Sequence, residues 1–564
     1  MRYFWFVVLF FIVAYLVPLA GRPLVTPDEF RYAEIPREMI ANGDYVTPRL
    51  LDVRYFEKPV LGYWLTAGCF KIFGDNAFSI RLPAALGAGL AALLIWILVD
   101  QSLRDRKLAA LAAIFYLSCG LVYGVGTFAV LDSQTTAFIT GILVTSYLAA
   151  VEPHFNRRKV LLLVFCGVFT ALAFLAKGFI AFAVPALAML GFLLWERRWK
   201  EFLLLPWIPL VVALALIAPW AIAIHKAEPD YWRYFIMIEH WQRFTADAPG
   251  QHPEPFWFLI PFLIGGVFPA ALLLIPGFTV GWAALERILR QPLYRFCLSA
   301  VVLPFLFFSA SSGKLATYIL PCFPPLAVPA AAVIAAYFKS GGHNRCFQVM
   351  LTIWGGLLAV ASLGFGVVLF LPFMERISYG WCFPAAVAMA VVGLVYGAAL
   401  LISRHADWRI RFHLFFGGMA LLLATGGWAI PDGLLGDKTP ERAMRELPAR
   451  LGFDPAAVKL FTTPSTMHAV AWVYGRKDVH TLNSRGELDY GDDRAKEEGR
   501  IGVAIDQKEL DRMLASEAHP AVVVIGRDRR SFYRPPAGTN CREALINEIR
   551  AIYIPEKGRA GGVQ

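Results

Sequence analysis

The residue types best suited to chemistry gather in a polar segment near the N-terminus, residues 21–78. Asp28 follows a Thr-Pro pair there, and Glu57 and Lys58 stand in the sequence Phe-Glu-Lys-Pro. A carboxylate such as Asp28 can act as a base or hold a cationic group, and a lysine ammonium can bind a phosphate through charge-assisted hydrogen bonds. After Lys58 the chain becomes apolar and aromatic, which suits a membrane interface. The alternative for Lys58 is a lysine that only snorkels to that interface.

Part of the same segment has a structural explanation. Thr26 and Pro27 are typical of a helix start, with Thr26 as the N-cap and Glu29 closing a capping box. We therefore expect Glu29 to act mainly as a cap, and Asp28 to keep the functional role. The other charged residues of this helix fit ion pairs along its surface and are expected to act mainly as scaffold: Arg31, Glu34, Arg37 and Glu38.

Three more ionisable residues fall at the predicted outer ends of apolar runs. Asp132 ends one such run, and Lys177 lies between two of them. Lys314 precedes another run, which carries Tyr318 one helical turn later. An ionisable residue at membrane depth is by default a functional hypothesis. Together with Asp28, these residues predict one polar chamber on the outer side of a membrane.

A second polar segment, residues 226–255, offers phosphate and metal ligands. Arg243 could bind a phosphate bidentately, and an interfacial arginine without that role is an equal alternative. His240 or His252 could hold a divalent ion (Zn²⁺, Mg²⁺ or Mn²⁺) together with Glu57. However, no zinc signature is present, and a lone loop histidine is more often not a ligand. A metal ion on Glu57 and His240 is therefore the weaker hypothesis, and no other cofactor is expected.

The composition defines the setting of these residues. Of 564 residues, 58% are apolar and 17% charged, and the mean hydropathy is +0.55. Soluble proteins are nearer half apolar and about a quarter charged. A soluble enzyme, a disordered regulator and a nucleic-acid binder are therefore excluded. The net charge of +11 raises the question of an acidic partner. The eight cysteines lack paired spacing, so we expect packing residues rather than disulfides.

Apolar windows of about 20 residues predict about thirteen membrane-spanning helices. The first is expected to be a signal anchor, because the residues that follow it do not fit a cleavage site. The predicted spans lie near residues 4–20, 79–99, 108–126, 134–151, 160–176, 179–196, 203–225, 256–283, 296–310, 315–337, 348–371, 380–402 and 412–430.

Basic residues alternate from loop to loop and orient these helices. One set of short loops carries clusters such as the Arg-Arg-Lys of residues 157–159, whereas the opposite set holds only Lys177, Lys314 and Arg376. Positive-inside logic places the basic loops and the N-terminus in the cytoplasm. An odd number of spans then places the C-terminus outside.

Two domains follow from this topology. Residues 1–432 form a transmembrane catalytic domain with outer loops 21–78 and 226–255, and residues 433–564 form a small soluble α/β domain on the same outer side. From residue 432 onward, 41 of 133 residues are charged. We expect this domain to brace the loops, since its sequence contains no catalytic constellation. Four short apolar runs predict its strands: 458–463, 469–474, 501–505 and 521–525.

Several motifs resemble one known family. They are DEFRYAEIPREMIANGDYVTPRL and RYFEKPVLGYW in the first outer loop, Asp132 near the top of a span, the Ala-Lys-Gly of residues 176–178, and SSGKLATYILPCFPPLA at 311–327. They resemble the bacterial 4-amino-4-deoxy-L-arabinose lipid A transferases, which are GT-C glycosyltransferases related to the protein O-mannosyltransferases. The resemblance covers the whole chain. It implies an α-helical integral membrane protein with about thirteen transmembrane helices and a small C-terminal α/β domain in the periplasm.

The resemblance also implies roles for individual residues. Asp28 and Asp132 match acidic positions that face one catalytic chamber. Lys58 and Arg243 match basic positions that hold the phosphate of a polyprenyl carrier. The remaining predicted substrate-binding residues are Tyr32, Tyr55 and Tyr318, which would line the sugar and phosphate pocket, and the basic residues Lys177, Lys314 and Arg31.

One departure from the family pattern lies in the first outer loop. Leu51-Asp52 stands where a turn-like Asn-Gly is expected, which puts the local loop geometry in doubt. The rest of that loop keeps the pattern, and the second outer loop matches less closely.

The implied function is transfer of 4-amino-4-deoxy-L-arabinose from undecaprenyl phosphate to lipid A phosphates at the periplasmic face of the bacterial inner membrane, giving resistance to polymyxin and other cationic peptides. Lys58 and Arg243 would stabilise the charge on the departing lipid phosphate. Because the acceptor phosphate is already anionic, we expect Asp28 to position it through an intermediary group or to hold the sugar ammonium. The expected partners are the polyprenyl-linked sugar, lipid A and membrane lipids, with no nucleic acid, and the protein is expected to be a monomer.

Two other functions stay open from the sequence. One is protein O-mannosyltransferase-like transfer to a hydroxyl group, in which Asp28 would be a true base. The other is a lipid transporter or flippase. Transport is less favoured, because the charged candidates gather at the outer edge rather than at the bilayer midplane, and no internal repeat is present.

Overall fold

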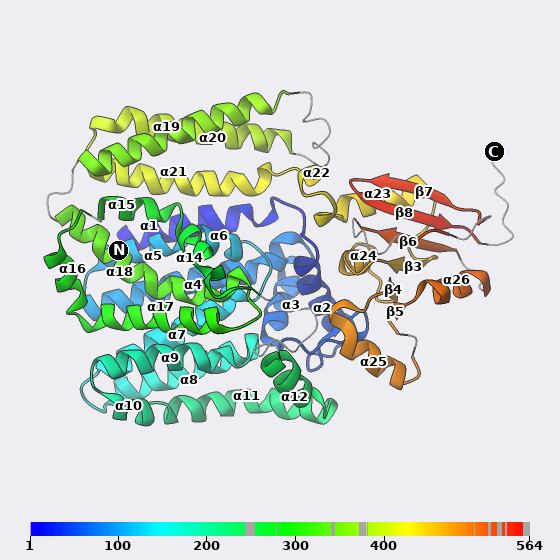
Figure 1. Cartoon of the computed structure of the whole chain (residues 1–564), viewed down its shortest axis with the longest axis horizontal. Coiled ribbons are helices and arrows are strands. Elements are labelled where there is room, and N and C mark those ends of the chain that lie inside the picture. The colour runs from blue at the N-terminus through cyan, green and yellow to red at the C-terminus, as the bar shows by residue number, and fades with distance from the viewer. Residues whose placement is uncertain are drawn as a thin grey trace.

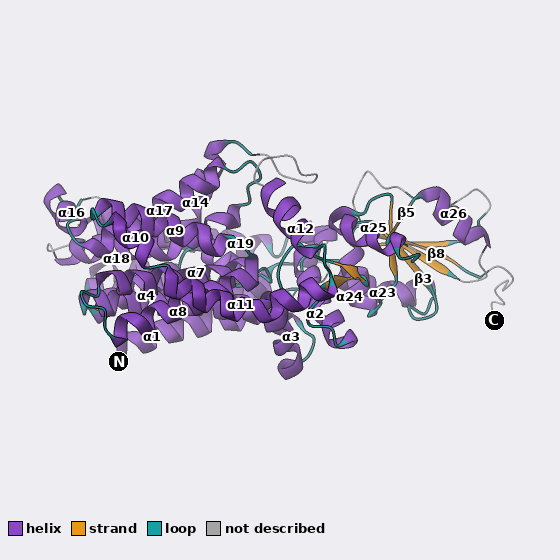
Figure 2. Ribbon diagram, turned by 90° about the horizontal axis from the view of Figure 1, so that it is seen from below, coloured by secondary structure: helices purple, strands orange, loops and turns teal. Residues whose placement is uncertain are grey.

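The computed structural model describes residues 2–242, 254–277, 279–339, 345–371, 380, 382–500, 502–516, 520–526, 533–535 and 539–556. Figure 1 shows a broad body of helices, many lying side by side, with a smaller part that contains a sheet at one end of it. A quarter turn shows that the sheet part extends the long axis of the helical body (Figure 2). The N-terminal helix begins at the end of the body farthest from the sheet (Figure 1).

The helices of the body follow the order of the chain. Those of its first half are α1 (Arg2–Phe11), η1 (Ile12–Leu16), η2 (Val17–Ala20), α2 (Asp28–Asn42), α3 (Leu61–Phe73), α4 (Ala77–Leu103), α5 (Arg106–Leu117), α6 (Gly120–Gly126), α7 (Asp132–Val151), α8 (Arg157–Lys177), α9 (Ile180–Trp195), α10 (Trp199–Leu204), α11 (Trp207–Ala227), α12 (Tyr231–Arg233) and η3 (Tyr234–Gln242). Those of its second half are η4 (Phe256–Phe258), α14 (Leu259–Val267), η5 (Ala270–Leu273), α15 (Leu274–Gly277), α16 (Trp282–Leu289), α17 (Pro292–Ala310), η6 (Ala316–Cys322), α18 (Phe323–Lys339), α19 (Arg345–Val368), α20 (Phe383–Ile402), η8 (Ser403–His405) and α21 (Trp408–Ala429).

Within the described residues, ten helical segments are long and apolar enough to cross a membrane, and one bent pair could add an eleventh. Three of the predicted spans take a different form. The span at 108–126 is divided between α5 and α6, the span at 179–196 is the 16-residue α9, and the span at 256–283 is divided among shorter helices. The predicted membrane fold is confirmed, whereas the predicted number of spans is not.

Two of the interrupted spans break at the same place in space. The backbone N–H of Gly120, the first residue of α6, donates to the carbonyl oxygen of Phe268 at 2.7 Å, and Cys119 forms a β-bridge with Pro269. A Cβ at Gly120 would lie 2.7 Å from that carbonyl oxygen, so glycine permits the close approach. Backbone groups inside a membrane must find partners within the protein. Here each break provides a partner for the other.

The start of α2 differs from the prediction. Its N-cap is Pro27, which makes no side-chain cap hydrogen bond, and the Thr26 hydroxyl instead donates to the Ser465 carbonyl oxygen at 2.8 Å. Glu29 does accept the Val25 backbone N–H at 3.0 Å. A glutamate in a capping box likewise accepts a backbone N–H from the residues before the helix. Thr26 as the N-cap is therefore wrong, because its hydroxyl bonds to the C-terminal part of the chain.

Glu29 lies at the centre of a buried ion-pair cluster. Its carboxylate is 2.6 Å from an Arg22 nitrogen and 2.7 Å from Arg81 Nε, and it also accepts the Ala129 backbone N–H at 3.0 Å. Burial would raise the pKa of Glu29, but Arg81 and Arg22 outweigh it and hold the pKa at about 2. The structural role expected for Glu29 is thus larger than a helix cap, since it joins α2 to α4 and to the segment before α7.

The C-terminal part is built on a six-stranded sheet in the order β5-β4-β3-β6-β8-β7. The first four strands in this order run parallel, and β8 pairs antiparallel with both β6 and β7. Phe461 of β3 stands between His480 of β4 and Val523 of β6 in the register. The elements are α22 (Asp432–Leu435), η9 (Gly436–Lys438), α23 (Glu441–Leu451), β3 (Lys459–Thr462), α24 (Met467–Tyr474), β4 (Val479–Leu482), η10 (Gly486–Leu488), α25 (Asp489–Glu497), β5 (Ala504–Ile505), α26 (Gln507–Ser516), β6 (Ala521–Ile525), β7 (Arg542–Ile546) and β8 (Ile549–Ile554).

One predicted strand of this sheet is wrong. Residues 469–474 belong to α24, whose apolar residues are buried against the sheet and against α2. A short apolar run that is buried on several sides has the same pattern in a helix as in a strand. The runs at 458–463 and 521–525 do form β3 and β6, whereas β4, β7 and β8 were not predicted.

The C-terminal part meets the helical body through the loops that follow β3 and β4. Ser465 after β3 accepts the hydrogen bond from Thr26, and Gly491 of α25 packs so closely on the hairpin before α3 that a Cβ would lie 2.3 Å from the Arg54 carbonyl oxygen. The carboxyl ends of parallel strands are where α/β proteins usually bind ligands. Here that edge contacts the first outer loop. Ion pairs from other segments of the C-terminal part add to the contact: Glu498 with Arg54, Arg494 with Asp230, and Lys477 and Arg500 with Asp52.

The Glu29 cluster makes Arg81 a sensitive position for stability. Arg81 is fully buried and also donates to the carbonyl oxygens of Leu19 and Pro23 at 2.7 and 2.8 Å. Breaking a buried ion pair by removing one partner costs about 3–5 kcal/mol, because the other charge stays buried. We expect Arg81→Leu to lower the free energy of unfolding in detergent micelles by about that amount, measured by denaturant titration.

The matched control is Arg158→Leu. The Arg158 side chain is 55% exposed and pairs with Glu152, and exposed pairs contribute about 0–1 kcal/mol. Equal stability of the two variants would contradict a structural role for the Glu29 cluster.

Candidate functional site

A hairpin places the Tyr-Phe-Glu-Lys segment beside α2. It consists of β1 (Arg49–Leu50) and β2 (Val53–Arg54), joined by a two-residue turn in which Leu51 and Asp52 have φ values of 55° and 61°. Asn-Gly usually fills such a turn. Here the buried Glu38 carboxylate accepts the N–H groups of Leu51 at 2.7 Å and Asp52 at 3.1 Å. The departure at Leu51-Asp52 therefore leaves the turn intact, and Glu38 holds a turn rather than the expected helical ion pair.

Arg31 is the centre of the contacts around the first outer loop. Its guanidinium pairs with Asp28 on its own helix and with Glu487 of the C-terminal part, and it donates to the Tyr55 hydroxyl at 3.1 Å. The Arg31 side chain is 11% exposed, whereas the Asp28 side chain is 42% exposed. Arg31 is thus more than the scaffold residue expected from the helical spacing, because it joins Asp28 to the C-terminal part.

Glu487 and His468 are site residues that the sequence did not reveal. His468 Nε2 lies 2.9 Å from a Glu487 carboxylate oxygen, and Tyr55 donates to the other oxygen at 3.4 Å. Burial would raise the pKa of Glu487, but Arg31 and His468 outweigh it and hold the pKa at about 2. The charged segment around Glu487 resembles any solvated loop, so no local pattern marks it. The C-terminal part therefore contacts the candidate site residues Arg31 and Tyr55 through Glu487.

Three tyrosines lie within this network. The rings of Tyr32 and Tyr63 stack with centroids 6.1 Å apart. Burial raises the pKa of the Tyr32 hydroxyl; the charges of Asp28, Asp132 and Glu57 add to this, and Arg31 opposes it. The charges of four predicted site residues thus all act on the Tyr32 hydroxyl. The Tyr55 hydroxyl contacts Arg31 and Glu487, as described above. Tyr63, which was not predicted, is fully buried, and its hydroxyl has no hydrogen-bond partner among the described residues.

Asp132, Lys177 and Tyr318 come together from three separate elements. Asp132 opens α7, and its carboxylate lies 2.6 Å from the Nζ of Lys177, the last residue of α8. The same Nζ lies 5.3 Å above the ring of Tyr318 on η6. A carboxylate at a helix N-terminus is favoured by the helix dipole. Three residues far apart in the sequence thus form one contact at the outer edge of the helical body.

Lys58 contacts the second outer loop. Its ammonium pairs with Glu239 of η3, donates to the Glu57 carbonyl oxygen at 3.0 Å, and lies 4.0 Å from the Glu57 carboxylate. An incoming phosphate would compete with Glu239 for this ammonium. The lysine is held at the place where the two predicted outer loops meet, rather than extended to a lipid surface.

One further basic residue, Lys314, is less closely tied to this group. Lys314 is buried, and its Nζ donates to the Glu254 carbonyl oxygen at 2.6 Å. Within the described residues no contact joins it to Asp28, Asp132 or Lys177. Arg243 and His252 lie outside the described residues.

Glu57 and His240, which were suggested for a metal, do not form a metal site in the described part of the chain. Among the residues that the structure describes, no group of three or more His, Cys, Asp and Glu side chains is close enough to hold a metal ion. Glu57 faces the Lys58 ammonium, and His240 Nδ1 bonds to the Phe235 carbonyl oxygen at 2.7 Å. No step of the chemistry is therefore assigned to a metal.

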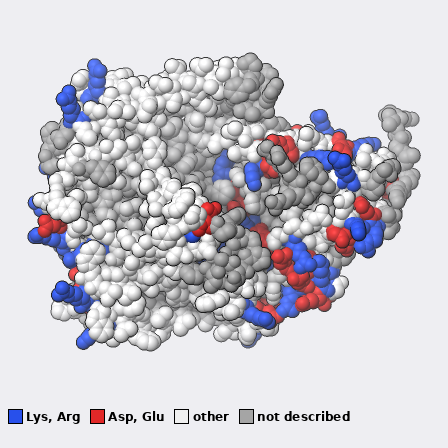
Figure 3. Space-filling model, viewed as in Figure 1, with Lys and Arg blue, Asp and Glu red and all other residues white. Residues whose placement is uncertain are grey.

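The charge distribution over the surface fits a site at a membrane boundary. Figure 3 shows charged side chains concentrated over the C-terminal part and at the opposite end of the helical body, with a broad and mostly uncharged band between them. The chamber lies where this band meets the C-terminal part. A lipid whose chain lies in the membrane could thus present its head group to cations and carboxylates together.

Comparison with known proteins decides the family. An undecaprenyl phosphate-α-4-amino-4-deoxy-L-arabinose arabinosyl transferase from Aeromonas salmonicida is 40% identical over 488 residues, which cover 86% of this chain and 87% of the relative. One from Pectobacterium atrosepticum is 36% identical over 548 residues, which cover 95% and 96%. The chain belongs to this family of arabinosyl transferases. It is a glycosyltransferase that uses a lipid-linked sugar, and the predicted family is confirmed.

Two further comparisons agree with this assignment. Residues 1–235 match the family model for dolichyl-phosphate-mannose-protein mannosyltransferases. The crystal structure of ArnT from Cupriavidus metallidurans bound to undecaprenyl phosphate shares the fold, with a TM-score of 0.76, 20% identity and 99% coverage of both chains. This arabinosyl transferase is therefore a multi-pass membrane protein with the predicted helical body and C-terminal α/β part.

The contact between Arg31 and Glu487 predicts that the C-terminal domain supports activity. Hydrogen bonds to charged groups contribute about 1.5–3 kcal/mol, which corresponds to about 10–100-fold in rate. We expect Glu487→Gln to lower the rate of sugar transfer by about that factor. The control is Glu543→Gln, which removes a 45% exposed carboxylate that pairs with Arg550 on β8. Equal rates for both variants would contradict the role of Glu487.

The same variant should change the acid stability. The pKa of Glu487 is held at about 2 in the folded protein against a usual value of 4.5, so its stabilising effect is present above pH 4.5 and is lost as the pH falls toward 2. We expect the stability advantage of the parent over Glu487→Gln to shrink as the pH falls through this range, measured by chemical unfolding. Glu29 titrates in the same range in both proteins, so only the difference between them reports on Glu487. A difference independent of pH would contradict this assignment.

The position of Lys177 over Tyr318 gives a separate prediction. A cation above an aromatic ring contributes about 0.5–2 kcal/mol. We expect Tyr318→Leu, which removes the ring, to slow transfer about tenfold, and Tyr318→Phe, which keeps it, to have a much smaller effect. If Phe and Leu slow transfer equally, the hydroxyl group rather than the ring carries the function.

Proposed function

We propose that this arabinosyl transferase moves 4-amino-4-deoxy-L-arabinose from undecaprenyl phosphate to phosphate groups of lipid A. The proposal is carried by three ion pairs of cation and carboxylate, Lys58–Glu239, Arg31–Asp28 and Lys177–Asp132, in a protein whose relatives are named for this donor. Two lipid phosphates and one sugar ammonium must meet in such a reaction. The chamber offers both cations and carboxylates for them.

The donor phosphate would be held by Lys58. When the bond between the sugar C1 and the phosphate oxygen breaks, negative charge grows on the departing undecaprenyl phosphate while the sugar becomes oxocarbenium-like. A cation already placed at that oxygen stabilises the transition state without reorganising. Lys58 is mostly buried and is positioned by Glu239. The phosphate would therefore take the place of the Glu239 carboxylate as the anionic partner of Lys58. Arg243 is proposed as the second phosphate ligand.

The acceptor would be a lipid A phosphate oxygen, which attacks C1 as the donor bond breaks. This oxygen is already anionic and needs no general base. Asp28 is paired with Arg31 and is the more exposed partner, which suits a group that orients a substrate. We assign Asp28 to the sugar ammonium or to the positioning of the acceptor, and the stacked Tyr32 and Tyr63 rings to the wall of the sugar pocket.

The cellular setting follows from the charge pattern. Basic short loops at the end of the helical body opposite the chamber would face the cytoplasm, so the chamber and the C-terminal domain would face the periplasm of the bacterial inner membrane. The protein would act as a monomer, and the added ammonium on lipid A would reduce the binding of polymyxin and other cationic peptides.

Asp28 tests the chemistry of the proposal. We expect Asp28→Asn to fold, since the side chain is partly exposed at the start of α2, and to reduce transfer at least about tenfold because a charge-assisted contact is lost. A variant that folds and transfers sugar at the parental rate would contradict any role for Asp28.

The substrate class is tested by mass spectrometry. Purified protein is incubated with the polyprenyl-linked sugar and either lipid A or a Ser/Thr peptide, and lipid A from cells with and without the chain is compared. We expect a mass increment of one aminoarabinose on lipid A and none on the peptide. Modification of the peptide alone would favour a protein O-mannosyltransferase-like activity, and movement of lipid without any new covalent product would favour a flippase.

A further inference from the structure

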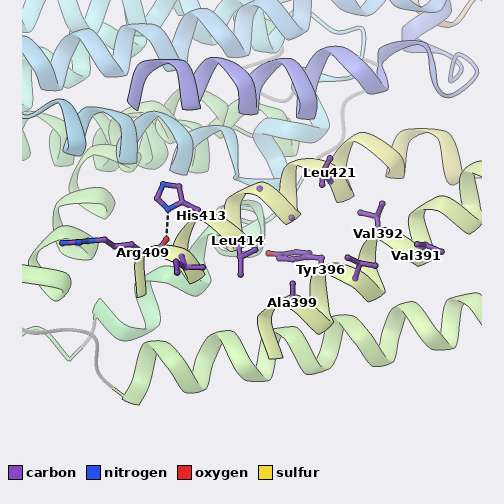
Figure 4. A pocket seen from close by; sticks show the side chains of 12 residues that line it. Val391, Val392, Tyr396, Ala399, Arg409, His413, Leu414 and Leu421 are labelled. Carbon is purple, nitrogen blue, oxygen red and sulfur yellow. Dashed lines mark hydrogen bonds between the residues drawn. The ribbon is translucent and has the colours of Figure 1, made fainter. Parts of the chain in front are cut away.

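A groove far from the chamber lies between α20 and α21 on the outside of the helical body. It holds about 740 Å³ and is lined almost entirely by apolar side chains. Its lining includes Val391 and Val395 on one helix and Ile410 and Leu421 on the other, all more than half exposed. Figure 4 shows these helices flanking the groove, with Arg409 and His413 toward one end of it.

The floor of the groove is shaped by glycine. Gly418 packs against the Tyr396 ring, where a Cβ would lie only 2.1 Å from a ring carbon, and the Tyr396 hydroxyl donates to the Phe415 carbonyl oxygen at 2.8 Å. Next to it, a Cβ at Gly417 would meet no atom within 4 Å. The two helices thus touch where Tyr396 packs on Gly418, and the space beside this contact, at Gly417, is empty. The groove is a fixed feature of the packing rather than a gap between loosely placed side chains.

Its length fits one leaflet of a bilayer. Arg409 and Leu421 mark its two ends on α21, and twelve residues of α-helix rise about 18 Å. Half of a bilayer hydrocarbon core is about 15 Å. One acyl chain lying along α21 would therefore fill the groove from the level of the head groups to the middle of the membrane.

The polar end of the groove is positively charged. The Arg409 guanidinium lies 5.4 Å above the Trp408 ring, and no carboxylate pairs with it among the described residues. Asp407 caps the helix by accepting the Arg409 backbone N–H at 2.8 Å. Arg411 is fully buried just inside and donates to the carbonyl oxygens of Gln348 and Leu400, both at the ends of helices. Two arginines against one aspartate leave this end with excess positive charge.

His413 adds a directed polar group at the same end. Its Nδ1 donates to the Arg409 carbonyl oxygen at 2.6 Å, which is the dashed contact in Figure 4. The ring is exposed at the side of the groove, within reach of a head group held by Arg409.

We propose that this groove binds one glycerophospholipid with an anionic head group, its phosphate on Arg409 and one acyl chain along α21. The site belongs to the leaflet opposite the catalytic chamber, because α21 runs from Trp408 at that end of the body to Ala429 next to the C-terminal part (Figure 1). It is thus separate from the donor and acceptor lipids of the transfer reaction, and it does not depend on the proposed function.

The experiment counts lipids retained by the delipidated protein in native mass spectrometry. Phosphatidylglycerol is titrated against phosphatidylcholine with the same acyl chains. We expect one phosphatidylglycerol to bind to the parent at concentrations at least fivefold lower than phosphatidylcholine. Gly417→Leu fills open space in the groove and should weaken the binding of both lipids, so that the preference is lost. Arg409→Gln should lower phosphatidylglycerol binding to the level of phosphatidylcholine.

The matched control is Gly426→Leu. Gly426 lies on the same helix outside the groove, and a Cβ there would also meet no atom within 4 Å, so this variant should bind phosphatidylglycerol like the parent. Val395→Trp, which fills the groove from α20, replaces Gly417→Leu if that variant does not fold. Equal binding of phosphatidylglycerol by the parent and by the filled variants, or equal binding of the two lipids by the parent, would overturn the proposal.

Discussion

The site depends on one buried cation, Arg31, and on the three groups that hold it. Asp28 lies on the same helix, Tyr55 follows the hairpin, and Glu487 comes from the C-terminal domain. An arginine with an 11% exposed side chain is costly unless it is paired, so the position of each partner constrains the others. The Asp28 carboxylate, the first outer loop and the C-terminal sheet are consequently fixed relative to one another by a single guanidinium.

The rest of the structure supports that contact from both sides. On the membrane side, the Glu29 cluster fastens the start of α2 to Arg81 of α4. On the outer side, the edge of the sheet that follows β3 and β4 brings Ser465, His468 and Glu487 onto α2. α/β proteins normally use this edge to bind small ligands. In this arabinosyl transferase it packs against α2 of the helical body and brings Glu487 to Arg31.

Much of this was predictable from the sequence, and the rest was hidden for physical reasons. Apolar length and the first-loop motifs predicted the helical body and the family, because hydropathy is a strong signal in membrane proteins. The structure also brings Asp132, Lys177 and Tyr318 into contact, as a shared chamber requires. Glu487 and Thr26 were missed or misread since their partners are more than 400 residues away, and local spacing carries no information about such pairs. The break at Cys119 in a predicted span was missed for the same reason. The hydrogen bond that satisfies the backbone there is accepted by Phe268, which is distant in the sequence.

The central claim is that Arg31 and Glu487 act as one unit across the two domains. A double-mutant cycle on the rate of sugar transfer from undecaprenyl phosphate to lipid A tests it most directly, with Arg31→Gln, Glu487→Gln and the double variant in one membrane preparation. Residues in direct contact show strong coupling in such a cycle, whereas distant ones are additive. We predict that the double variant is no slower than the slower single variant. If the two losses multiply, the contact does not carry the function and this account is wrong.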